Sequence, residues 1–201
     1  MAIALFFVAE PSIQALPPYE RLTAACFQVM TSITTVDFNT IPIGRLSQAS
    51  LFLVVLLMIV GASPAGTGGG LKTTTFTALW GVIRSSIHGR EKVTFWGKEI
   101  PEERIRVAIA SLGFYAGALI LGCYLLALTE SVPFEELLFE SASALGTVGL
   151  STGITAQLTP IGKLILIGLM FIGRLGPLAF GIALFWPPGK TDEPGKEDLA
   201  V

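Results

Sequence analysis

Two short polar stretches are the part of this sequence that could do chemistry. Residues 35–40 read TVDFNT and residues 147–152 read TVGLST, and both lie between apolar stretches. Main-chain carbonyls assisted by threonine hydroxyls can replace the hydration shell of a monovalent cation. We call residues 35–40 the first strip and residues 147–152 the second strip, and ask which elements could place them around an ion.

The composition indicates a membrane protein. Of the 201 residues 52% are hydrophobic and only 14% are charged, and the formal net charge is -2. Soluble domains carry about 25% charged residues. Because about 20 apolar residues cross the hydrocarbon core, three stretches are candidate spans: from about Leu46 into the 80s with a polar interruption, Val107 to Leu128, and Leu158 to Trp186. The apolar start, residues 1–9, resembles the end of a truncated helix.

Charge placement predicts which side faces the cytoplasm. A short basic segment, which is typical of a cytoplasmic loop, contains Arg84, His88, Arg90, Lys92, Lys98, Arg104 and Arg106. Acidic connections precede the strips and should face outward. The tail, residues 187–201, is rich in Pro, Gly and charge and is expected to be a disordered cytoplasmic end. The chain is therefore predicted to cross the cytoplasmic membrane several times.

The chain repeats itself at a spacing of 112 residues. At this spacing the two strips and the sequence before them align without a gap, and the matched pairs are Phe27 with Phe139, Thr35 with Thr147, Val36 with Val148 and Thr40 with Thr152. The register continues through Leu46 with Leu158, Met58 with Met170 and Gly61 with Gly173. A shared polar pair and a common register with the following helix indicate a genuine duplication.

Each copy contains a segment too short to cross a membrane. Tyr19 to Ile33 and Phe134 to Leu145 each follow a proline-marked turn and precede a strip. Such a segment can only dip in and return, and irregular backbone at membrane depth is tolerated where protein or a wet cavity supplies partners. The sequence predicts an all-α membrane protein of two tandem repeats, each a helix, a re-entrant pore-loop and a helix. The strips then form two sides of an ion filter; the alternative is that they are polar surface loops that cap helices.

A glycine-rich segment interrupts the first long apolar stretch. Residues 61–75 read GASPAGTGGGLKTTT, and an uninterrupted helix from Leu46 to Ile87 would be about 63 Å long, roughly twice the hydrocarbon thickness. A nucleotide phosphate loop is disfavoured, because Leu71 stands where that motif needs glycine before the lysine. A passive kink and a mobile loop beneath the strips both remain open.

The matched position in the second copy, GRLGP, places Arg174 inside the last apolar stretch. An intramembrane arginine is functional by default. It could form an electrostatic barrier beside a cation path, anchor the glycine-rich segment, or make a structural ion pair.

These residues resemble the Trk/Ktr/HKT family of potassium transporters, and most closely its KtrB-like and TrkH-like membrane subunits. The resemblance rests on TTVDFNT, GASPAGTGGGLKTTTF, FESASALGTVGLSTG and LMFIGRLGP. Such a protein builds one pore from four successive units, and this sequence resembles the C-terminal half. Residues 1–90 correspond to the third unit, with its first helix truncated and its second broken at 61–70, and residues 91–186 to the fourth.

The resemblance implies a role for particular residues. The filter-lining, ion-binding residues are Thr35, Val36, Asp37, Thr147, Val148 and Gly149, and K+ is held by the backbone carbonyls of Thr35, Val36, Thr147 and Val148. The intramembrane gating loop comprises Ala65, Gly66, Thr67, Gly68, Gly69 and Gly70, with Arg174 facing the pore. The implied partners are two further pore units, a second copy in a homodimer, a cytoplasmic nucleotide-binding regulatory subunit and membrane lipid. No covalently bound cofactor and no nucleic acid are implied.

Asp37 departs from the family pattern, which has glycine at this position. Asp is among the few other residues that tolerate a positive φ, and its carboxylate adds negative charge to the filter. We therefore expect potassium uptake without enzymatic chemistry, with weaker discrimination between K+ and Na+ as one alternative. A non-conducting or incomplete membrane scaffold is the other.

Overall fold

The computed structural model describes residues 1–61, 69–89, 92–95 and 98–176. In chain order the helices are α1 (Ala2–Ala9), α2 (Pro18–Thr34), α3 (Gln48–Ile59), α4 (Thr73–Ile87), α5 (Glu102–Thr129), α6 (Phe134–Gly146) and α7 (Pro160–Leu175), with 3-10 turns η1 (Pro11–Ile13) and η2 (Ile43–Arg45). Strand β1 (Thr94–Phe95) pairs antiparallel with β2 (Lys98–Glu99). This two-residue ladder in the basic segment is a small exception to the all-α expectation.

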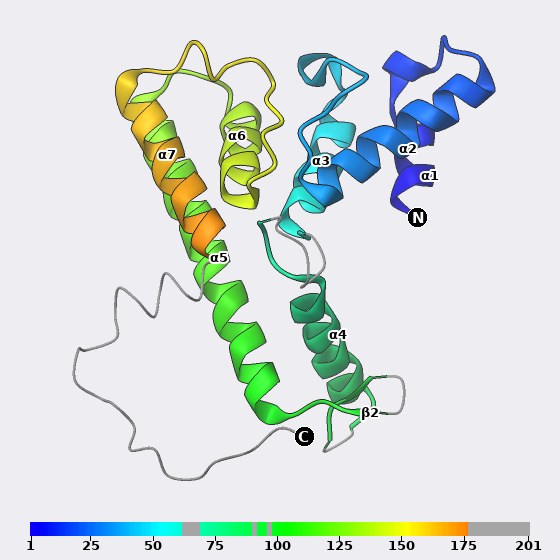
Figure 1. Ribbon diagram of the computed structural model, residues 1–201, viewed down its shortest axis with the longest axis vertical. Coiled ribbons are helices and arrows are strands. Elements are labelled where there is room, and N and C mark those ends of the chain that lie inside the picture. Colours follow the sequence, from blue (N-terminus) through cyan, green and yellow to red (C-terminus); the bar gives the residue numbers. More distant parts are fainter. Residues whose placement is uncertain (62–68, 90–91, 96–97, 177–201) are drawn as a thin grey trace, which may run out of the picture.

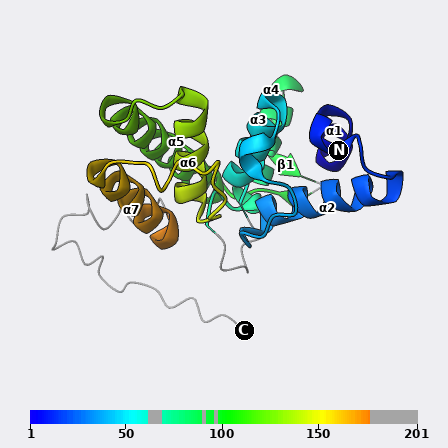
Figure 2. The ribbon, with the colours of Figure 1, turned by 90° about the horizontal axis from the view of Figure 1, so that it is seen from above.

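The helices form two groups joined through α6. Helices α1, α2 and α3 contact one another, and α5, α6 and α7 make a second group, while α6 also packs against α3 (Figures 1 and 2). Helix α4 extends away from the first group and packs against the lower half of α5 (Figure 1). The two predicted repeats are therefore connected by side-chain packing at two levels.

Helix α5 has the length and composition of a membrane span. It contains 28 residues and is about 42 Å long. In the described part of the chain it is the single helix that is long and apolar enough to cross a membrane, and only 22% of its most apolar window is buried. Ile109, Ile120 and Leu128 are exposed on its surface, as expected for side chains that face lipid. The helix begins five residues before the predicted Val107, because Glu102 and Glu103 are favourable in a first turn.

The predicted stretch from Leu46 into the 80s is two helices. Helix α3 ends at Ile59 and α4 begins at Thr73. Val60 and Leu71 form an isolated parallel bridge, and the Leu71 N–H donates to the Ile59 carbonyl at 3.1 Å. Gly61 lies directly against Gly70, so the chain leaves and returns at one point. The described flanks of the glycine-rich segment therefore lie side by side; residues 62–68 between them lie outside the described residues, and both the kink and the mobile loop stay predictions.

The two short helices differ in length. Helix α2 has 17 residues and extends the predicted segment, residues 19–33, by one residue at each end, and α6 has 13 and extends the predicted residues 134–145 by one. After each helix the chain runs back toward the end of the molecule where α3 or α7 begins (Figure 1). This course agrees with the predicted hairpins, and their placement in a membrane stays a prediction.

A glutamate carboxylate holds the N-cap residue of α3 and of α7; Glu10 is fully buried and Glu130 is half-buried. The backbone N–H and hydroxyl of Ser47, the N-cap of α3, donate to Glu10 at 3.0 and 3.1 Å. The backbone N–H and hydroxyl of Thr159, the N-cap of α7, donate to Glu130 at 3.1 and 2.5 Å. Burial raises the pKa of the Glu10 carboxyl, but hydrogen bonds from nearby serines outweigh it, and its pKa lies below the ordinary value. Ser47 and Thr159 are 112 residues apart, so the two predicted repeats have the same N-cap arrangement at matched positions.

Candidate ion-binding site

Each strip begins with a left-handed turn that ends a short helix. Thr35 closes α2 at φ 57° and ψ 44°, and Thr147 closes α6 at φ 52° and ψ 39°. Two residues further on, Asp37 and Gly149 also have positive φ, 67° and 96°. Positive φ is uncommon for residues other than glycine. Its recurrence at matched positions shows that the duplication extends to backbone conformation, and Asp37 takes the left-handed conformation expected of it.

In each turn a backbone N–H group of the strip is hydrogen-bonded to the preceding helix, while the strip's carbonyl oxygens are not bonded within the described part of the chain. The Val36 N–H donates to the Thr31 carbonyl at 3.3 Å, and the Val148 N–H donates to the Ser143 carbonyl at 2.9 Å. Among the described residues, no hydrogen bond ends on the main-chain oxygen atoms of the four predicted K+ ligands, Thr35, Val36, Thr147 and Val148. Polar backbone groups removed from water need partners. These oxygen atoms are therefore available to a cation or to water.

The two strips meet at Asp37 and Gly149. A Cβ added at Gly149 would come within 2.5 Å of the Asp37 Cγ and 2.6 Å of its Oδ2. The Asp37 carboxylate therefore lies against the backbone of the second strip, across the boundary between the two halves. The two strips are thus in direct contact through Asp37 and Gly149.

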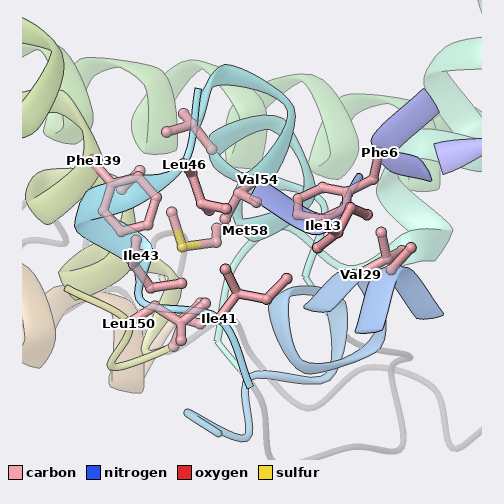
Figure 3. Packing of buried hydrophobic residues seen from close by; sticks show 14 residues of the cluster. Phe6, Ile13, Val29, Ile41, Ile43, Leu46, Val54, Met58, Phe139 and Leu150 are labelled. Carbon is pink, nitrogen blue, oxygen red and sulfur yellow. The ribbon is translucent and has the colours of Figure 1, made fainter. Parts of the chain in front are cut away.

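The strips are covered to very different extents. Val148 and Leu150 are 2% and 3% exposed, whereas Val36 and Phe38 are 48% and 67% exposed. The second strip packs in a core cluster with α3, and Leu150 and Phe139 lie beside Ile43 and Met58 (Figure 3). Within the described ranges, no helix of this chain covers Val36 and Phe38 in the same way. One strip is thus enclosed by this chain, and the other has an open side.

The end of the glycine-rich segment contacts the base of the second strip. The Gly69 N–H donates to Thr147 Oγ1 at 2.8 Å. A Cβ at Gly69 would come within 2.7 Å of the Gly146 carbonyl oxygen, so a larger residue does not fit there. Gly70 has φ 75° and also contacts the Met58 carbonyl. The remaining predicted gating residues, Ala65, Gly66, Thr67 and Gly68, lie outside the described residues.

Arg174 lines a cavity that the second strip also lines. The cavity has a volume of about 410 Å³ and is bordered by Thr147, Val148, Gly149, Glu140 and Arg174, among others. Arg174 is exposed on α7. The structure therefore brings the predicted arginine to the same space as three of the predicted filter residues.

Sequence reasoning missed Glu140, which is a buried carboxylate on α6. A signal was present, because the 112-residue register pairs it with Gln28, also polar and buried. No group of three or more His, Cys, Asp or Glu side chains that could hold a metal ion occurs in the residues described.

Comparison with known proteins first gives the class of fold. The structure is similar to the crystal structure of the potassium transporter TrkH from Vibrio parahaemolyticus, with a TM-score of 0.76 over 93% of this chain and 42% of that chain, at 20% identity. The chain therefore shares the helical fold of that structure over most of its length.

Sequence comparison then gives the family. A family model described as "TrkH: Cation transport protein" matches residues 3–188, and the chain belongs to this family. It is 37% identical over 161 residues to the Ktr system potassium uptake protein B of Bacillus subtilis, covering 80% of this chain and 36% of that protein. It is 35% identical over 161 residues to the potassium/sodium uptake protein NtpJ of Enterococcus hirae, covering 78% and 36%. The chain therefore spans about a third of the length of these relatives. Both are transport proteins, in agreement with the expectation that this chain is not an enzyme.

The contact between Asp37 and Gly149 predicts coupled stabilities. Gly149→Ala should lower the free energy of unfolding by about 2 kcal/mol, from backbone strain plus the clash with the Asp37 carboxylate. In an Asp37→Gly background the clash is absent, and we expect a coupling energy of about 1 kcal/mol from a double-mutant cycle measured by chemical unfolding in detergent.

Gly153 supplies the control for this cycle. It also has positive φ, 104°, but nothing lies within 4 Å of an added Cβ. Gly153→Ala should therefore show strain without coupling to Asp37. Equal coupling for Gly149 and Gly153 would contradict contact between the strips.

Proposed function

We propose that this chain supplies two of the four pore units of a potassium uptake transporter in the cytoplasmic membrane. K+ would move down its electrochemical gradient, held by the carbonyl oxygens of Thr35, Val36, Thr147 and Val148. The observation that carries this proposal is the matched pair of left-handed turns, in which the Val36 and Val148 N–H groups bond to carbonyls of α2 and α6 while these four oxygens accept no hydrogen bond from the described residues. Relatives such as the Bacillus subtilis protein are named potassium uptake proteins, which agrees with it.

The open side of the first strip supports the requirement for two further units. The second strip packs against α3, and Val55 and Met58 are buried in that cluster. Their counterparts on α7, Ile167 and Met170, are exposed, just as Val36 and Phe38 are. Two further units could repeat this contact, one by packing a helix against the first strip and the other by packing a strip against α7. The four units would then form a closed ring.

We further propose that the glycine-rich loop gates the path. Its described end is hydrogen-bonded to Thr147, so movement of the loop would be felt at the base of the second strip. Arg174, in the adjoining cavity, would add an electrostatic barrier or hold the loop. A homodimer and a cytoplasmic nucleotide-binding regulatory subunit belong to the same proposal, with the basic segment between α4 and α5 facing the regulator.

Transport of Na+ as well as K+ is the second candidate. Asp37 adds an exposed carboxylate at the junction of the strips. One relative is named a potassium/sodium uptake protein. A carboxylate ligand binds small cations more strongly than a carbonyl does, which would reduce the preference for K+.

The proposed function is tested by rescue of a bacterium that lacks its potassium uptake systems. This chain within a complete four-unit chain should restore growth at low external K+, because all four strips are then present. The chain expressed alone tests whether two copies can close the ring. An expressed, membrane-inserted four-unit chain that gives no K+ uptake would support the rival hypothesis of a non-conducting scaffold.

Asp37→Gly should raise the permeability ratio of K+ to Na+ in the same cells by about tenfold, which corresponds to about 1.4 kcal/mol. The physical reason is that the substitution removes the carboxylate and keeps a residue that adopts positive φ freely. Ion-substitution currents or tracer competition measure the ratio. Glu103→Gln, an exposed acidic residue at the start of α5, is the charge-matched control. An unchanged ratio in Asp37→Gly would exclude a role of Asp37 in selectivity.

Gly69→Ala tests the gate. The added methyl group would collide with Thr147 and with the Gly146 carbonyl, so the loop must move away from the strip. We expect K+ flux to change at least about fivefold, upward if the loop obstructs the path and toward zero if the displaced loop blocks it. Gly168→Ala on α7, where nothing lies within 4 Å, controls for the substitution itself. Wild-type flux in Gly69→Ala would leave the loop a structural connection.

A further inference from the structure

Glu140 binds the outer part of the second strip to the short helix that precedes it. The carboxylate is only 4% exposed. It accepts hydrogen bonds from Ser151 Oγ at 2.6 Å, Thr155 Oγ1 at 2.8 Å, and the backbone N–H and hydroxyl of Thr152 at 3.1 and 3.4 Å. An ionised carboxylate offers about four lone-pair sites. The four donors use both carboxylate oxygens, three at Oε1 and one at Oε2, and all of them come from residues 151–155.

These bonds fix the second strip at its outer end, and other bonds fix its inner end. Val148 is held by the Ser143 carbonyl, and Thr147 Oγ1 accepts from Gly69. Only Gly149 and Leu150 lie between the inner and outer anchors, and Leu150 is buried. Hydrogen bonds to a charged acceptor are shorter and stronger than neutral ones. The second strip is consequently held at both of its ends, which restricts movement of its carbonyl groups.

The first strip lacks the equivalent arrangement. The residue matched to Glu140 is Gln28, which is fully buried, and neither its Oε1 nor its Nε2 has a hydrogen-bond partner among the described residues. The counterparts of Ser151 and Thr155 are Asn39 and Ile43. The Asn39 amide donates to the Ile41 carbonyl at 3.3 Å, and isoleucine has no donor in its side chain. Instead, Thr31 Oγ1 accepts from the Phe38 N–H at 3.1 Å.

We infer that Glu140 is a positioning residue for ion selectivity, which keeps the carbonyl groups of Thr147 and Val148 at a spacing that suits K+ and makes the second strip the stiffer of the two. This inference rests on the proposed function. The first strip has the hydrogen bond from Phe38 to Thr31 but, among the described residues, no carboxylate anchor at its outer end, so it can contract more readily around a smaller ion. Discrimination against Na+ therefore depends on the second strip more than on the first.

Glu140→Gln in a complete four-unit chain tests this role. The amide keeps the size of the side chain but presents an NH2 group to hydroxyl and N–H donors, so part of the cluster is lost. We expect the permeability ratio of K+ to Na+ to fall by about tenfold, since one or more charge-assisted hydrogen bonds are removed. Glu136→Gln on the same helix removes a charge outside the cluster and should leave the ratio unchanged.

Thr155→Val separates positioning from simple charge attraction. It removes one donor and leaves the Glu140 charge in place, so the ratio should fall in the same direction, and the combination with Glu140→Gln should fall less than the product of the two single effects. A fall in Glu140→Gln with no effect of Thr155→Val would mean that charge alone acts, and would overturn the inference.

Hydrogen–deuterium exchange supplies a readout that does not require transport. In the purified wild-type chain, the amide of Thr152 should exchange slowly; in Glu140→Gln and in Thr155→Val, exchange across residues 149–155 should become about tenfold faster, with no change across α5. If the wild-type four-unit chain carries no K+, the proposed function fails whatever the exchange shows. If it does carry K+, and neither variant changes selectivity or exchange, the positioning role of Glu140 is wrong while the proposed function stands.

Discussion

Backbone polar groups within a bilayer must be satisfied by protein, by a water-filled cavity or by a bound ion, and the rest of this structure depends on that constraint. Within the described residues, the left-handed turns at Thr35 and Thr147 satisfy this constraint for N–H groups but not for carbonyl oxygens. They direct the N–H groups of Val36 and Val148 to the ends of α2 and α6, and in the described part of the chain the neighbouring carbonyl oxygens accept no hydrogen bond. In the proposed function a cation supplies the missing partner of these oxygen atoms.

The two halves apply this solution with unequal support. The second strip is covered by α3, contacted by Gly69 and bound to Glu140, whereas the first strip has an open side and a buried Gln28 without partners in the described ranges. Packing of the second strip on the helix of the first half is a head-to-tail contact, and such contacts close into rings when the rotation permits. In the proposed account, the exposed surfaces of the first strip and α7 are therefore the two ends of half a ring. Selectivity then arises from one stiff strip and one strip that carries an additional carboxylate.

The sequence predicted the features that depend on local chemistry or on register. The 112-residue repeat, the broken helix before Thr73 and the left-handed conformation of Asp37 follow from residue types and spacing. The shared role of Glu10 and Glu130 was not predicted, because the turns that follow them differ in length and the two residues fall outside the common register. Glu140 was missed because a glutamate in a short helix is usually exposed. Its role depends on hydrogen-bond donors eleven to fifteen residues further along the chain. The unequal cover of the strips follows from packing between repeats, which spacing within one repeat does not specify.

The central claim is that the four carbonyl oxygens of Thr35, Val36, Thr147 and Val148 share a bound alkali ion. Anomalous X-ray scattering from crystals of a complete four-unit chain grown in Rb+, a heavier substitute for K+, measures this directly. We expect anomalous peaks on the axis between the strips, within ligand distance of these oxygens. Adding K+, which competes for the same sites, should reduce the peaks. A well-ordered map in which either strip turns its carbonyl groups toward lipid or bulk solvent, with no Rb+ between the strips, would contradict it.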